Sequence, residues 1–124
     1  GVGRRMILDG QITPRGLADL FEGFAGALRK LGGWGLEWVR TVAVCPGAGG
    51  SLFEQVDADA YVTGEMQHHQ VLDLVQQGKV VLLLGHTASE RPLLPRYVEM
   101  IEATDARRID WSVSEADVTP WEMR

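Results

Sequence analysis

The sequence contains one cysteine, Cys45, among its 124 residues. A single thiol cannot form an internal disulfide, and zinc sites built on cysteine use several thiols. This cysteine content is typical of a protein from a reducing, cytoplasmic compartment. We interpret Cys45 as a small buried residue at a strand end; a reactive thiol is the alternative.

The sequence also has no apolar run of the ~20 residues needed to cross a membrane, and no secretory signal at its start. We therefore expect a cytoplasmic protein with no membrane partner. The first residue is Gly1 rather than methionine, which we interpret as the start either of a piece of a longer protein or of a trimmed polypeptide.

An excess of positive charge is missing as well, because the formal net charge is -5. The arginine pairs at residues 4–5 and 107–108 are too small to form a basic patch. A nucleic-acid backbone needs such a patch for binding. We therefore expect no direct nucleic-acid partner.

Complete cofactor motifs are absent from the glycine-rich loop that contains Gly47, Gly49, Gly50 and Ser51. The loop lacks the third glycine of a dinucleotide fingerprint and the lysine of a phosphate-binding P-loop. Its position between a predicted strand and a predicted helix still suits an anion-binding loop. The alternative is a sharp turn in which Ser51 caps the helix.

What is present is a composition of 45% hydrophobic and 23% charged residues, which is typical of one globular domain. We expect this domain to span residues 1–124, with a surface tail from about residue 115. Strands and helices alternate along the chain, which predicts an α/β fold with a mainly parallel sheet and helices packed on it. The expected strands are residues 6–8, 41–45, 60–63, 80–84 and 109–113, and the expected helices are residues 14–28, 52–56, 66–77 and 92–103. Residues 34–39 fit either a short edge strand or a turn.

The main candidate site follows the most apolar strand, residues 80–84. The chain turns at Gly85 and then presents His86 and, four residues later, Glu90. Ligands bind at the carboxyl ends of parallel strands. An imidazole and a carboxylate at this edge suit a metal ion or a proton-transfer pair.

A second interpretation of the same segment is a helix capping box formed by Thr87 and Glu90. Pro92 and Pro95 argue against it, because prolines beyond the first helical turn remove backbone donors and clash with earlier carbonyls. On that argument the helix begins near Pro92, and residues 87–91 form a tight functional turn.

A further group of polar residues follows the preceding strand, where Glu65 precedes His68 and His69 by three and four residues. If Glu65 opens the helix, helical spacing brings both imidazoles near its carboxylate. The alternatives are a packed core histidine and a carboxylate placed favourably at a helix N-terminus. All three histidines of the chain lie between His68 and His86, which favours a polar cleft.

Three motifs in order resemble the NGG-one-interacting-factor-three family, whose members are often labelled GTP cyclohydrolase 1 type 2 homologues. They are Ala-Val-Cys-Pro-Gly-Ala-Gly-Gly-Ser at residues 43–51, Tyr-Val-Thr-Gly-Glu-Met-Gln-His-His at residues 61–69, and Gly-His-Thr-Ala-Ser-Glu-Arg at residues 85–91. The resemblance covers most of the chain to about residue 114 and corresponds to the C-terminal half of the family.

This resemblance implies one lobe of a two-lobed α/β fold, assembled as a ring-shaped, dimer-based homo-oligomer. It implies two divalent metal ions between the lobes, with His86 and Glu90 as ligands and with Glu65, His68 and His69 lining the cleft. The remaining ligands of the family lie in an N-terminal half that this sequence does not contain. Zinc, iron and manganese all suit histidine with carboxylate.

The first functional hypothesis is a metal-dependent hydrolase acting on a nucleotide, with Glu65 or a neighbouring histidine handling the proton. The second is a metal-binding regulatory or interaction protein without catalysis, such as a metal carrier or a transcription-related partner. A third is an interaction domain in which the motifs serve only the structure.

Overall fold

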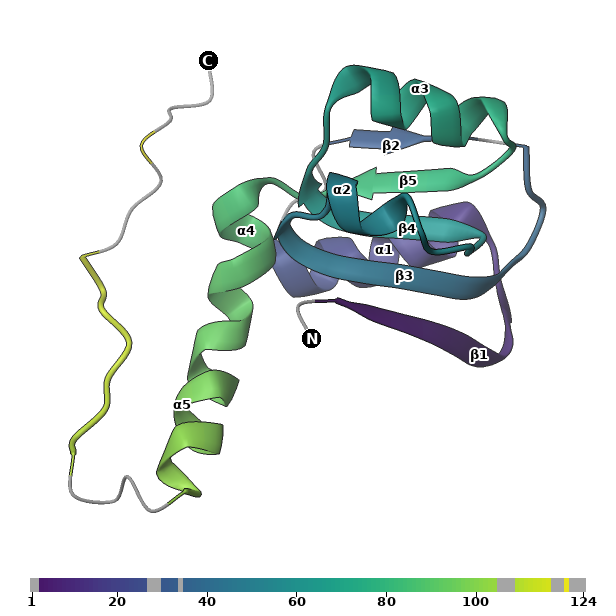
Figure 1. Ribbon diagram of the computed structural model, residues 1–124. Coiled ribbons are helices and arrows are strands. Elements are labelled where there is room, and N and C mark those ends of the chain that lie inside the picture. Colours follow the sequence, from purple (N-terminus) through teal and green to yellow (C-terminus); the bar gives the residue numbers. More distant parts are fainter. Residues whose placement is uncertain (1–2, 27–29, 34, 105–108, 117–119, 121–124) are drawn as a thin grey trace.

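The chain folds around one five-stranded β-sheet with helices on both faces. The computed structural model describes residues 3–26, 30–33, 35–104, 109–116 and 120 (Figure 1). The strands are β1 (Arg4–Ile12), β2 (Lys30–Gly32), β3 (Val39–Ala48), β4 (Ala60–Glu65) and β5 (Val80–Leu83). The helices are α1 (Pro14–Ala25), α2 (Gly50–Phe53), α3 (His68–Gln76), α4 (His86–Glu90), the 3-10 turn η1 (Arg91–Leu93) and α5 (Leu94–Glu102).

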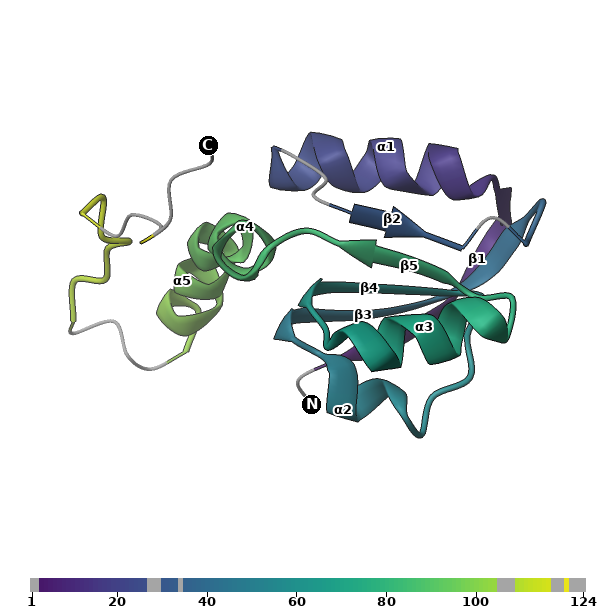
Figure 2. The ribbon, with the colours of Figure 1, turned by 90° about the horizontal axis from the view of Figure 1, so that it is seen from above.

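The strand order across the sheet is β1-β3-β4-β5-β2. The three central strands β3, β4 and β5 run parallel, and the edge strands β1 and β2 pair antiparallel with their neighbours. This confirms the predicted α/β fold with a mainly parallel sheet. Figure 2 shows α1 on one face of the sheet and α2 and α3 on the other.

Two apolar clusters hold these layers together. Under α1, Leu17 packs with the central valines and leucines of the sheet, among them Val62 and Leu82, which are fully buried. On the opposite face, Phe53 of α2 meets Tyr61 of β4 edge-on, with ring centroids 5.1 Å apart. Strands covered on both faces are buried throughout, which explains the continuous apolar runs in β4 and β5.

The predicted helix over residues 14–28 begins as expected and ends earlier than expected. The Thr13 hydroxyl accepts a hydrogen bond from the Gly16 N–H at 3.0 Å, and Pro14 occupies the first turn. Gly26, with φ 78°, caps the C-terminus. Residue 28 lies outside the described residues.

Other boundaries also differ from the prediction. The short edge strand β2 follows the helix expected over residues 14–28, at a place where no strand was expected, because three residues are too few for a periodic pattern. Helix α2 is a single turn that begins at Gly50 rather than at residue 52. The ambiguous segment 34–39 contributes only Val39 to a strand among its described residues.

The expected strand over residues 109–113 is absent, since residues 109–116 form neither helix nor strand. This segment instead lies against α5, where Trp111 and Val113 line a hollow together with Tyr97. Figure 1 shows this segment beside α5 and away from the sheet. Its apolar side chains therefore contact a helix and not a neighbouring strand. In the part of the chain described, no helix is both long enough and apolar enough to span a bilayer.

Candidate metal site

The candidate site lies where the three parallel strands end. Cys45 of β3 pairs with Thr63 of β4, which pairs with Leu83 of β5. The loop after β3, Glu65 at the end of β4, and His86 after β5 therefore meet at one edge of the sheet, as the sequence predicts.

His86 lies between two carboxylates. Its Nδ1 is 2.7 Å from Oε1 of Glu65, and its Nε2 is 3.4 Å from Oε1 of Glu90. The His86 side chain is 49% exposed, so a solute can reach the imidazole. The two ring nitrogens thus have different partners, one held by a short hydrogen bond and one by a longer, looser contact.

These carboxylates raise the pKa of His86 above its ordinary value of 6.5, chiefly through the hydrogen bond to Glu65. Partial burial acts in the opposite direction, and the negative charges of Glu90 and Glu65 add to the increase. The protonated ring is therefore more favoured than in a free imidazole, and a metal ion at Nε2 has to compete with that proton.

We expect an NMR titration of the metal-free chain to give His86 a pKa above 6.5, and Glu65→Gln to lower it. Because the folded-state pKa is raised, the stabilising contribution is complete below about pH 6.5 and is lost as the pH rises through the folded-state value. The contribution is small because the pair is half exposed and screened by solvent. A His86 pKa unchanged by Glu65→Gln would contradict the assigned contact.

His86 is the first residue of helix α4, and Gly85 before it is the N-cap with φ 89°. The predicted tight turn over residues 87–91 is therefore wrong, and so is the capping box at Thr87. Because α4 is helical, His86 and Glu90 share one helix face at i and i+4.

The two prolines explain why the helix start was misplaced. Pro92 lies in the 3-10 turn η1, and Pro95 lies in the first turn of α5. The 3-10 turn separates two short α-helices, so Pro95 begins a new helix instead of breaking the interior of α4.

Ser89 and Thr63 fix the loops around the site, and sequence reasoning missed both. The Ser89 hydroxyl donates to the His86 carbonyl at 2.8 Å and accepts from the Gly47 N–H at 2.9 Å. The buried Thr63 hydroxyl donates to the Gly47 carbonyl at 3.0 Å and accepts from the Gly49 N–H at 2.9 Å. The available signal was a hydroxyl residue close to each predicted strand end, Thr63 near the end of β4 and Ser89 shortly after β5.

The glycine loop is close to the carboxylates. Gly47 has φ 71°, and a Cβ there would overlap Oε1 of Glu90. Because its N–H groups at Gly47 and Gly49 already bind hydroxyls, any anion has to use other groups of the loop. Gly50 and Ser51 line a pocket of about 460 Å³ that also contains the Glu65 side chain. The anion-binding role of the loop stays a prediction.

His68 and His69 lie on α3, apart from His86. The N-cap of α3 is Gln67, whose capping box is formed with Gln70, so Glu65 ends β4 and does not open the helix. The predicted contact of Glu65 with these histidines is replaced by the contact with His86.

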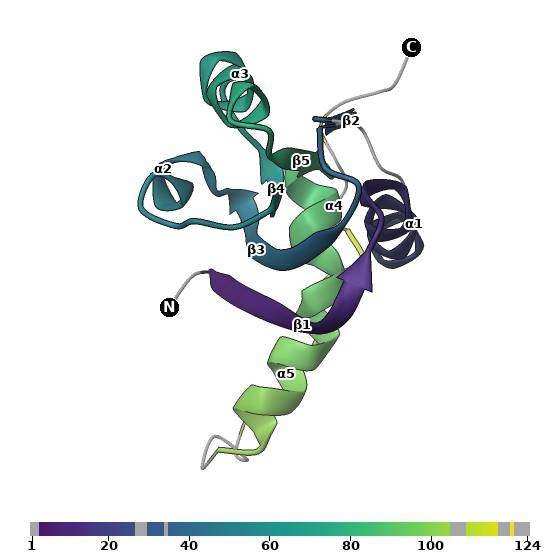
Figure 3. The same ribbon diagram turned by 90° about the vertical axis from the view of Figure 1, so that its right-hand side faces the viewer.

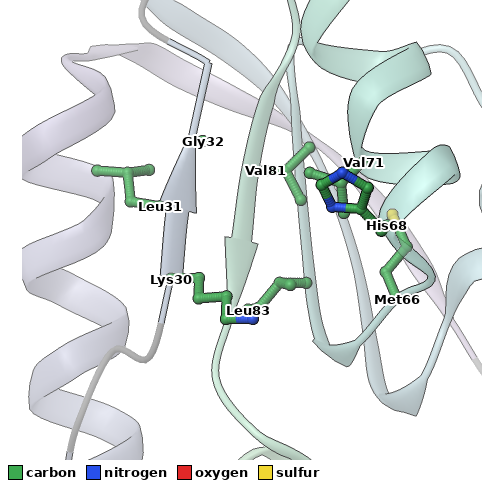
Figure 4. Close-up of a pocket in the computed structure, with 8 residues that line it drawn as sticks. All are labelled: Lys30, Leu31, Gly32, Met66, His68, Val71, Val81 and Leu83. Atoms are coloured by element: carbon green, nitrogen blue, oxygen red, sulfur yellow. The ribbon is translucent and has the colours of Figure 1, made fainter.

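His68 lines a second pocket of about 420 Å³ between β2, β5 and α3, and His69 is exposed on α3. Figure 4 shows His68 on the α3 side of this pocket and Lys30 on the β2 side. Met66 borders both this pocket and the one that contains Glu65. A role of His68 and His69 as pocket residues stays a prediction.

Cys45 is buried next to the site. Burial, and then the negative charge of Glu90, raise the pKa of the Cys45 thiol above 9.0. At neutral pH the thiol is protonated and is a poor nucleophile and metal ligand. This favours the structural interpretation of Cys45.

His86 and Glu90 are of the residue types that bind metal ions, but they are too few to form a complete site. Imidazole nitrogen and carboxylate oxygen are common zinc, iron and manganese ligands. Among the residues that the structure describes, no three His, Cys, Asp or Glu side chains gather as metal ligands. A metal site that used His86 and Glu90 would therefore need further donors.

Comparison with known proteins gives consistent matches. The model of the family Duf34/NIF3 (NGG1p interacting factor 3) matches residues 11–120. NIF3-like protein 1 of Mus musculus is 43% identical over 82 residues, which are 66% of this chain and 22% of the mouse protein. NGG1-interacting factor 3 of Saccharomyces cerevisiae is 43% identical over 63 residues, which are 49% of this chain and 22% of the yeast protein.

Among solved structures, protein ybgI, whose function is described as unknown, superposes with a TM-score of 0.72 at 26% identity. That superposition covers 85% of this chain and 44% of the ybgI chain. The present chain thus corresponds to a minor part of each relative.

Proposed function

Because this chain belongs to the Duf34/NIF3 family, we propose that it supplies part of the divalent-metal site of a metal-dependent hydrolase acting on a nucleotide, a GTP-cyclohydrolase-like reaction. The observation that carries the proposal is the contact of His86 with Glu65 at Nδ1 and with Glu90 near Nε2. The other ligands, and the second metal ion that the resemblance implies, belong to a segment or a chain outside this sequence.

The roles of Glu65 and His86 follow from the ring nitrogen of His86 that is already hydrogen-bonded. Glu65 accepts a hydrogen bond from Nδ1, which leaves Nε2 of His86 as the ligand atom, next to the Glu90 carboxylate. A carboxylate on the far nitrogen of a ligating histidine fixes its tautomer and orientation. We therefore assign Glu65 to positioning His86, in place of the direct proton transfer expected from the sequence. Bound zinc, iron or manganese would supply an activated water.

The nucleotide would lie beside Glu65. The pocket of about 460 Å³ there is lined by hydrogen-bonding groups, among them Ser51, Gln67 and Gln70. Such groups suit the base and sugar of a nucleotide.

A second candidate function is a metal-binding interaction protein without catalysis, because the yeast relative bears the name NGG1-interacting factor 3. Two measurements on a longer protein that contains this sequence separate the candidates. GTP turnover that is lost in His86→Ala supports the hydrolase, and metal binding without turnover supports the interaction protein.

The metal-binding proposal is tested by the zinc affinity of a longer protein that contains this sequence, measured by competition with a coloured chelator. We expect His86→Ala and Glu90→Gln to abolish measurable binding, since each removes a ligand. Glu65→Gln should weaken binding by about 10- to 100-fold, the usual effect of losing such a positioning carboxylate.

Glu102→Gln is the matched control, because Glu102 lies exposed at the end of α5 and should leave zinc affinity unchanged. Circular dichroism establishes that each variant is folded. Equal zinc affinities for the wild type and all four variants would refute the assigned site.

A further inference from the structure

The pocket that His68 lines has no part in the metal site described above. It has a volume of about 420 Å³ and lies between β2, β5 and α3. Figure 3 shows α3 over the β5 and β2 end of the sheet, on the face opposite α1. Val71, Val81 and Leu83 give the pocket apolar walls. Pockets of this size and kind hold small molecules, with a few polar groups that orient them.

The strand register places Lys30 at the same edge of the sheet as the metal site. Lys30 pairs with Leu83, and Leu83 pairs with Thr63. Because opposite residues of an antiparallel pair share a face, the Lys30 side chain is on the pocket face together with Leu83. Lys30 is exposed, and no other described residue forms a salt bridge or hydrogen bond with its side chain. Its ammonium group is therefore available to a ligand.

His68 supplies a second hydrogen-bond donor on the opposite wall. It is the first residue of α3, and Figure 4 shows its ring on the α3 side of the pocket, across from Lys30. A neutral imidazole carries one N–H and a protonated imidazole carries two, so the ring can donate to an anion in either state. The N-terminus of α3 adds a partial positive charge. None of the residues that line this pocket is acidic.

The pocket beside Glu65 has the opposite electrostatic character. Glu65 lines it, and Met66 borders both pockets. A phosphate group beside Glu65 would lie near a like charge, whereas a phosphate group beside Lys30 would lie near an unlike charge. A nucleotide with its base and sugar beside Glu65 is therefore favoured to place its phosphates beyond Met66.

We propose that the pocket between Lys30 and His68 binds the phosphate groups of the nucleotide. The identity of the ligand rests on the proposed function, and the anionic character of the pocket's ligand rests on Lys30, His68 and the helix end. The Lys30 ammonium and the His68 N–H both donate to phosphate oxygens. The apolar walls exclude water, which strengthens both hydrogen bonds.

Calorimetric titration of a longer protein that contains this sequence tests the pocket, with metal removed by a chelator. The ligands are GTP, guanosine and inorganic triphosphate. We expect Lys30→Gln to weaken the binding of GTP and triphosphate by about tenfold, because it removes a charged donor. His68→Ala should weaken both by about three- to tenfold. Guanosine, which has no phosphate, should bind both variants as it binds the wild type.

Arg15→Gln is the matched control. It also removes one positive charge, but Arg15 is exposed on α1, on the other face of the sheet. It should leave all three affinities unchanged, which separates a contact in the pocket from a change in net charge. Circular dichroism establishes that each variant is folded, and Lys30→Arg should retain triphosphate binding.

The outcomes separate the two possible sources of phosphate. If Lys30→Gln weakens triphosphate binding but not GTP binding, the pocket takes a free phosphate compound and its assignment to the nucleotide is wrong. A wild type that binds neither ligand, or Lys30→Gln and His68→Ala variants that bind both as tightly as the wild type, would overturn the pocket. The titration contains no metal and measures no turnover, so its result is independent of whether the metal site catalyses hydrolysis.

Discussion

Replacing Gly64 by alanine should lower the free energy of unfolding by about 3 kcal/mol, a large part of the stability of a domain this size. The added Cβ would lie 2.6 Å from the Gly47 carbonyl oxygen, 2.6 Å from Oγ of Ser89 and 2.9 Å from the Gly85 carbonyl oxygen. Two of these atoms are backbone, so relief requires a strand or loop to move. Urea denaturation of the metal-free chain measures the change.

Gly23→Ala is the control for this prediction. Gly23 lies inside α1, and a Cβ there would meet no atom within 4 Å. Alanine is the better helix former, so this variant should gain up to about 1 kcal/mol. If Gly64→Ala unfolds at the wild-type urea concentration, the close approach of three strand ends is wrong.

Gly47→Ala should leave the fold largely intact and disable the site. Its Cβ would overlap Oε1 of Glu90, the end of a flexible side chain that can move away at low cost. The carboxylate then leaves the vicinity of His86, and we expect zinc affinity to fall at least about tenfold. The positive φ of Gly47 adds a stability cost of about 1 to 2 kcal/mol.

Gly26→Ala separates the backbone cost of a positive φ from the displacement of the Glu90 carboxylate. Gly26 has a similar φ of 78°, and a Cβ there would meet nothing within 4 Å. It should therefore show the backbone cost with unchanged zinc affinity. If both variants lose the same stability and neither loses zinc, the Glu90 carboxylate is not a ligand.

The centre of the fold was predictable because its signals are local. Two strands appear in the sequence as short apolar runs bounded by turn residues, at residues 60–63 and 80–84. This pattern is typical of strands that are buried on both faces. Parallel pairing then follows from the helices between them, and the meeting of the strand ends follows from the parallel pairing. In this way the sequence also predicted that Glu65 and His86 lie on one edge.

The parts that failed depend on contacts between distant segments. Spacing along the chain favoured His68 and His69 as partners of Glu65, but β4 extends through Glu65 and α3 starts only at His68. The partner is His86, twenty-one residues away. Likewise, nothing local distinguishes Pro92 in a 3-10 turn from a proline that breaks a helix. Residues 109–113 have the alternating polarity of a strand, but no sheet edge lies beside them for pairing.

The central claim is that His86 binds a metal ion through Nε2 while Glu65 holds Nδ1. Nitrogen-15 NMR of the imidazoles during a zinc titration tests it most directly, because the two ring nitrogens give separate signals. We expect zinc to shift Nε2 of His86 while Nδ1 keeps its proton. Zinc that leaves the His86 ring unchanged, or that binds at Nδ1, would contradict the account.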